Sequence, residues 1–108
     1  MRPQIVSATG VTTSSVIVVT PSISPFNIGF GVKISGSITY TVQHTFDNPL
    51  DPAFNPATAT WYNHAFVVSQ TVNADGNYAY PVQAVRLNIT AGVGTGTLTL
   101  IQAGIAGV

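Results

Sequence analysis

The sequence predicts an all-β fold, and three features of its composition lead to that prediction. Val, Ile and Ala dominate the apolar residues while Leu is scarce, and β-branched side chains suit a pleated sheet better than a helix. Ten Gly and seven Pro provide many chain reversals. No segment keeps a helical apolar period. We expect one domain over residues 1–108, an antiparallel sandwich or small barrel of about eight short strands.

Three strands are predicted in the first half of the chain. Residues 15–20 form a continuous apolar run that ends at Pro21, which is typical of a buried strand. Residues 28–33 alternate Phe30 and Val32 with two glycines, which favours a strand with a bulge or a close backbone approach. Residues 37–46 show the clearest alternation and predict a half-solvated strand. Its expected inner residues are Ile38, Tyr40, Val42, His44 and Phe46, and its expected outer residues are Thr39, Thr41, Gln43 and Thr45.

Residues 47–58 are predicted to form an ordered loop. Pro49, Pro52 and Pro56 exclude a regular helix or a central strand from this segment. Leu50 and Phe54 are its large apolar side chains, and we expect them to fix the loop to the body of the domain.

The second half of the chain predicts further strands separated by turns. A short strand is expected at residues 60–62, another at 66–72, and a hairpin turn at 73–77, where Asp75 and Gly76 supply positive φ. A return strand at 78–80 is interrupted by Pro81. Residues 84–90 alternate apolar and polar side chains, 92–96 form a flexible glycine turn, and 97–102 form the last strand before an apolar tail.

The charge content indicates a chain that works in an assembly. Only 6% of the residues are charged and the formal net charge is zero, roughly a quarter of the usual charged share. A lone soluble domain normally uses charge to keep its surface apart from its neighbours, so much of this surface is expected to face other protein. No basic stripe exists to bind nucleic acid, no apolar run spans a membrane, and residues 1–5 lack the apolar core of a leader.

The residues that bear chemistry favour structural roles. Asp47 and Asp51 could offer oxygens to Ca²⁺, but their spacing matches no calcium loop, and Asp also starts turns by bonding its own backbone. His44 and His64 could bind zinc with Asp47 as a third ligand, but nothing sets the two histidines at ligand spacing. We therefore favour turn-forming aspartates and hydrogen-bonded core-edge histidines, and expect no metal and no cofactor.

No catalytic residues are predicted, and the chain is not expected to be an enzyme. Three Asp and no Glu are a poor inventory for a glycosidase, no nucleophile elbow occurs, and the 92–96 glycine run lacks the Lys of a phosphate loop. The aromatic residues of the second half fit core packing first, a protein interface second and a sugar platform third. They are Trp61, Tyr62, Tyr78 and Tyr80.

Several segments between residues 37 and 104 resemble small virion structural proteins of tailed bacteriophages. They are Thr39-Tyr40-Thr41-Val42-Gln43-His44-Thr45-Phe46-Asp47, Phe54-Asn55-Pro56-Ala57-Thr58-Ala59-Thr60-Trp61, Asn73-Ala74-Asp75-Gly76-Asn77-Tyr78, Val85-Arg86-Leu87-Asn88-Ile89-Thr90 and Leu100-Ile101-Gln102-Ala103-Gly104. The pattern is similar to that of the head decoration (cement) proteins of short-tailed phages. That resemblance implies a β-sandwich of jelly-roll type and binding to a capsid.

The resemblance and the low charge together predict a capsid decoration protein on the outer surface of the virion, made in the host cytoplasm. Its partners would be the major capsid protein and further copies of itself, with a homotrimer favoured and a dimer next. The alternatives are a head-fibre or tail-associated virion module and a carbohydrate-binding β-sandwich. Arg86 is expected to pair with Asp47 or with a neighbouring subunit. The candidate interface residues are Leu50, Phe54, Trp61, Tyr62, Arg86, Gln102, Ile105 and Val108.

Overall fold

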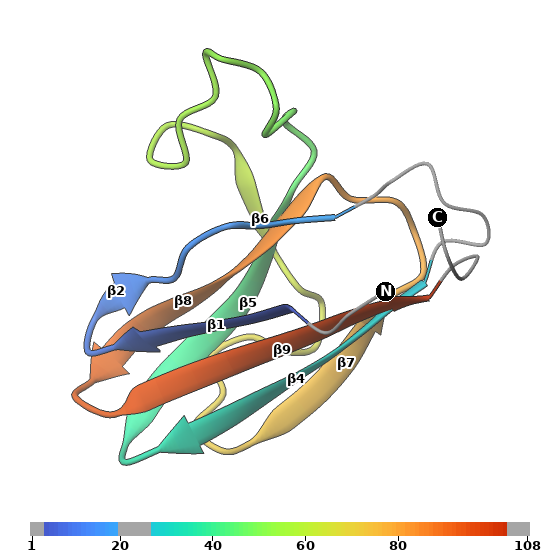
Figure 1. Cartoon of the computed structure of the whole chain (residues 1–108). Helices are drawn as coiled ribbons and strands as arrows, with labels where there is room; N and C mark the ends of the chain where they lie inside the picture. The colour runs from blue at the N-terminus through green and yellow to red at the C-terminus, as the bar shows by residue number, and fades with distance from the viewer. Residues whose placement is uncertain (1–3, 20–26, 104–108) are drawn as a thin grey trace.

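A computed structural model describes residues 4–19 and 27–103, which form two antiparallel sheets packed face to face (Figure 1). The first sheet has the order β1 (Gln4–Thr9), β9 (Thr95–Ala103), β4 (Asn27–Ser35), β7 (Ala74–Tyr78). The second has the order β2 (Thr12–Thr13), β8 (Ala84–Gly92), β5 (Ile38–Thr45), β6 (Trp61–Asn63), and β3 (Ile17–Val18) also pairs with β8. The all-β prediction is confirmed. The described ranges contain no helix, and hence none long and apolar enough to cross a membrane.

Two-residue turns at one end of the domain carry the chain from one sheet to the other. They lie at residues 10–11, 36–37 and 93–94, between β1 and β2, β4 and β5, and β8 and β9. Gly10 and Gly36 have φ of 72° and 84°, values that favour glycine. The turns are also bonded to one another, because the Gly10 N–H donates to the Gly94 carbonyl (3.0 Å) and the Gly94 N–H to the Ser37 carbonyl (3.3 Å).

The core fills the space between the two sheets. The inner faces of the long central strands supply most of it, as the alternation in residues 38–42 and 84–90 predicted. The most deeply buried side chains of this core are Ile28, Tyr40, Val42, Tyr78, Val85, Leu87, Leu98 and Leu100.

Strands at the start of the chain differ from the prediction. β1 and β2 were not predicted, because only Ala8 of β1 is fully buried and the strand has no clear apolar alternation. The predicted strand at 15–20 is reduced to Ile17–Val18, and Thr20 lies outside the described residues.

The bulge predicted in residues 28–33 is wrong. β4 pairs with β9 without a register shift from Asn27 to Ser35. A Cβ added at Gly29 or Gly31 would meet nothing within 4 Å, so no backbone approaches closely either. The irregularity lies instead between β5 and β8, where the register shifts between Thr39 and Tyr40.

The strand predicted at 66–72 and the hairpin turn at 73–77 are also wrong. Residues 65–69 are a series of bends, and only Gln70 forms a bridge, with Tyr40. Asp75 and Gly76 lie inside β7, which pairs with β4. A Cβ at Gly76 would lie 2.9 Å from the Phe30 ring and 3.1 Å from the His64 ring, so glycine makes room there for two buried rings.

Candidate binding surface

The 47–60 loop joins β5 to β6 and projects beyond the two sheets (Figure 1). Its two ends are tied together, because the Thr45 hydroxyl donates to the Thr60 carbonyl (2.7 Å) and Asp47 Oδ2 accepts the Thr60 N–H (2.9 Å). The Asp47 N–H in turn donates to Thr45 Oγ1 (3.1 Å).

The outer face of β5 is more buried than predicted. Thr45 and Thr41 both point to this face, yet Thr45 is fully buried and Thr41 is almost fully buried. The half-solvated strand predicted for residues 37–46 is therefore wrong on its outer face.

The side chains of Trp61, Arg86 and Gln43 hold the middle of the loop against the outer face of the second sheet. The Pro56 carbonyl accepts hydrogen bonds from Trp61 Nε1 (2.9 Å) and Arg86 Nη1 (3.4 Å). The Arg86 guanidinium lies 4.1 Å from the centre of the Trp61 ring, a cation–π distance. Arg86 Nε donates to Gln43 Oε1 (2.9 Å), and Gln43 lies directly opposite Arg86 in the register of β5 and β8.

The expected ion pair between Arg86 and Asp47 is wrong, since both side chains have other partners. Asp47 accepts the Thr60 N–H, while Arg86 contacts Gln43, Pro56 and Trp61. Partial burial lowers the pKa of Arg86 from its ordinary value. The arginine therefore acts as a packed and hydrogen-bonded part of the loop support.

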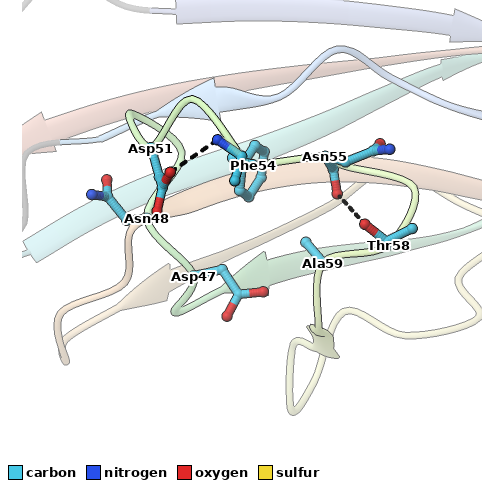
Figure 2. Close-up of a pocket in the computed structure, with 8 residues that line it drawn as sticks. Asp47, Asn48, Asp51, Phe54, Asn55, Thr58 and Ala59 are labelled. Atoms are coloured by element: carbon cyan, nitrogen blue, oxygen red, sulfur yellow. Dashed lines mark hydrogen bonds between the residues drawn. The ribbon is translucent and has the colours of Figure 1, made fainter.

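Figure 2 shows a pocket of about 310 Å³ that lies within the loop itself. Three side-chain oxygens around it accept backbone N–H groups two residues further on, at Leu50 (3.0 Å), Ala53 (2.9 Å) and Ala57 (3.0 Å). The pocket is lined by Asp47, Asn48, Asp51, Ala53, Phe54, Asn55, Thr58 and Ala59.

Asp51 has the turn-forming role that the sequence favoured, whereas Asp47 bonds to Thr60 at the far end of the loop. Asp51 Oδ1 caps its own turn, and the Phe54 N–H also donates to the Asp51 carbonyl (2.9 Å; Figure 2). Among residues 4–19 and 27–103, no group of three or more His, Asp or Glu side chains is placed to hold a metal ion.

Leu50 does not fix the loop to the body of the domain, contrary to expectation. Its side chain is 79% exposed. Phe54 is half-buried and faces the pocket. Hydrogen bonds of Thr45, Asp47 and Pro56 hold the loop instead. The Leu50 side chain is therefore exposed to solvent on a loop whose backbone is held in place.

A second exposed apolar surface lies where β5, β6 and the segment after β7 meet. Its members, here called the aromatic patch, are Phe46, Tyr62 and Tyr80, exposed by 50%, 50% and 48%. Their rings surround His44, with Tyr62 stacked on it at 5.9 Å and Phe46 edge-on at 5.5 Å. Phe46 was predicted to lie in the core, and Tyr80 was named only among the aromatic residues.

The buried His44 supports this patch from the core side. His44 Nδ1 lies 2.9 Å from the hydroxyl of the fully buried Tyr78. Burial, with a smaller contribution from His64, lowers the pKa of His44, and burial raises the pKa of Tyr78. Both shifts favour the neutral forms of these side chains. The core-edge role predicted for His44 is confirmed.

His64 organises the irregular segment that follows β6. Its Nδ1 accepts the N–H groups of Phe66 (3.2 Å) and Val67 (3.1 Å), so its Nε2 carries the hydrogen and donates to the Asn77 carbonyl (3.0 Å). These bonds use the first two N–H groups of the segment that was predicted to be a strand at 66–72.

The remaining candidates are divided between surface, core and undescribed residues. Tyr62 belongs to the aromatic patch and Trp61 is half-buried under Arg86. Gln102 was expected to belong to the binding surface. It is only 2% exposed, on the inner face of β9, so that expectation is wrong. Ile105 and Val108 lie outside the described residues.

No protein-family model, curated protein or solved structure matches this chain. The candidate surface consists of exposed apolar side chains on the 47–60 loop and in the aromatic patch.

Proposed function

We propose that this chain is a bacteriophage capsid decoration protein that binds the outer surface of the head and stabilises it against internal pressure. The observation that carries the proposal is the 47–60 loop, which is tied at its base and its middle yet leaves Leu50 79% exposed. A supported apolar side chain loses little conformational entropy on docking. The low charge of the chain fits a surface that faces other protein.

The proposed mechanism is mechanical. The loop and the aromatic patch would bury apolar area across junctions between subunits of the major capsid protein. Only protein bound to the assembled shell contributes this stabilisation, so binding shifts the equilibrium towards the intact head. In this proposal the protein is made in the host cytoplasm and acts on the virion surface as a closed homo-oligomer, for which the sequence favoured a trimer and then a dimer.

The proposed fold type is a jelly roll. Strand order supports it, because β1-β9-β4-β7 faces β2-β8-β5-β6 and most successive strands cross from one sheet to the other, except β2 to β3 and β5 to β6. Eight strands in two interleaved Greek keys give this arrangement.

Binding to heads tests the proposed function. Heads of the encoding phage that lack this protein are mixed with wild-type protein or with Leu50→Asp, and occupancy and head melting are measured. We expect Leu50→Asp to bind about tenfold or more weakly, because it places a charge in an apolar contact. Val93→Asp is the matched control, since Val93 is 87% exposed in the turn between β8 and β9. Equal binding by both variants would refute the loop contact, and no binding of wild type would refute the function.

The aromatic patch supports a second candidate, a carbohydrate-binding module. Tyr62 and Tyr80 present half-exposed rings, and an exposed aromatic ring can pack against the C–H groups of a sugar. Glycan binding that disappears in Tyr62→Ala, with capsid binding absent, would favour this candidate over decoration.

A further inference from the structure

The outer edge of β1 is the one long strand edge that the described part of the fold leaves unprotected. β1 ends the first sheet, and among the described strands its only sheet partner is β9. In an antiparallel ladder, alternate residues direct their N–H and C=O groups to the partner and the others direct theirs away. Half of the backbone groups of residues 4–9 therefore point outward from the sheet.

The other described sheet edges are shortened, covered or charged. β7 carries the exposed Asp75, and the side chain of Asn73 just before it accepts the Ile34 N–H (2.9 Å). β6 has only three residues, and later in the chain the backbone groups of Val67 and Gln70 bond to β5. β2 and β3 have two residues each and are separated by residues 14–16. Such features are the usual means by which proteins prevent edge pairing.

β1 has none of these features. It pairs with β9 in regular register from Gln4 to Thr9. It contains no charge, no proline and no bulge, and Ile5 is 62% exposed. An edge of this kind is a ready template for another strand.

We propose that β1 pairs antiparallel with β1 of a second copy of this chain, across a twofold axis. The two four-stranded sheets would then join edge to edge into one continuous sheet of eight strands. This interface deepens the proposed function by specifying the homo-oligomer, and it selects the dimer over the trimer that the sequence favoured.

Complementarity of the strand with itself supports a second copy as the occupant. Ile5 and Ser7 lie on the outer face of the sheet, while Ala8 is buried and Val6 packs against the core. Antiparallel registers centred on Ser7 or on Val6 place inner residues opposite inner residues and outer opposite outer. The strand is uncharged, so no charge is buried or opposed in either register.

Edge charges provide the first test. Wild type and the variants Ile5→Lys, Ser7→Lys and Asn77→Lys are compared by sedimentation equilibrium. Asn77 is exposed on β7, the opposite edge of the same sheet, and is the matched control. We expect a wild-type dimer of twice 11.2 kDa. Both β1 variants should raise its dissociation constant about tenfold or more, and Asn77→Lys should leave it unchanged.

A cross-link and hydrogen exchange provide the second test. The chain has no cysteine, so Ser7→Cys and Asn77→Cys each place a single thiol on one edge. A short bismaleimide should give a covalent dimer with Ser7→Cys only, and amides of residues 4–9 should gain protection as concentration rises. Monomeric wild type at its highest soluble concentration would overturn the pairing, as would dimers that resist both β1 lysine variants. A monomer that still binds heads would overturn the pairing and leave the proposed function standing.

Discussion

Removing the Arg86 side chain should destabilise the whole domain and loosen the 47–60 loop. Arg86→Ala deletes the guanidinium above the Trp61 ring (4.1 Å), the bond to Gln43 (2.9 Å) and the longer bond to the Pro56 carbonyl (3.4 Å). An exposed cation on the surface of a protein contributes little, so a large loss would identify Arg86 as part of the loop support.

The expected loss of unfolding free energy is about 2 kcal/mol. A cation–π contact at a partly buried site contributes roughly 1 kcal/mol, and a hydrogen bond from a charged donor adds about 1 kcal/mol after exchange with water. The bond at 3.4 Å is long and is given no weight. For a domain of this size, a loss of this order lowers the Tm by roughly 10 °C.

Urea denaturation measures this loss directly. Trp61 is the only tryptophan, so its fluorescence reports on the loop support, while far-UV circular dichroism reports on the sheets. Lys33→Ala is the control, because Lys33 is exposed on β4. Limited proteolysis should also cut residues 47–60 faster in Arg86→Ala.

The result that refutes this reasoning is a loss in Arg86→Ala that matches that of Lys33→Ala by both probes. A loss seen by fluorescence alone would show that Arg86 supports the loop without stabilising the sheets. Arg86→Lys separates the contributions further, because it keeps a positive charge but loses the planar group that stacks on Trp61 and bonds Gln43.

Three further predictions concern the turns, the buried histidine and the base of the loop. Gly92→Ala should lower the free energy of unfolding by roughly 2 kcal/mol or more, because φ at Gly92 is 98° and a Cβ there would overlap the Ser37 carbonyl oxygen. Gly29→Ala should leave the free energy of unfolding unchanged or raise it by up to about 1 kcal/mol. Thermal melts of both variants check this pair. Because the pKa of His44 is lowered, the folded state binds fewer protons than the unfolded chain just below about pH 6.5. Stability should therefore fall as pH drops through that value, and a urea titration at each pH should show a smaller fall in His44→Gln. Thr45→Val should cost roughly 1–3 kcal/mol, since it removes both bonds that its hydroxyl makes at the base of the loop, and equal urea midpoints would contradict this.

The sequence alone was sufficient for the features that depend on local chemistry. The β-branched composition predicted the all-β class, and the alternation in β5 and β8 predicted which side chains face the core, because a strand buried on one face repeats its apolar residues every second position. Three prolines predicted the irregular loop after β5, since proline removes a donor and fixes φ. Leu50 and Arg86 were singled out from the sequence, but Leu50 does not fix the loop to the domain and Arg86 does not pair with Asp47.

Features that depend on distant partners were decided only by the tertiary structure. Arg86 faces Gln43 because β8 and β5 pair in one particular register, and a register is a property of two strands. Residues 66–72 have a strand-like composition, but the N–H groups of Phe66 and Val67 bond to the His64 ring and not to a neighbouring strand. β1 has few buried side chains because it lies at an edge, so its pattern was too weak to predict a strand. The same edge position leaves its backbone groups free to pair with another chain.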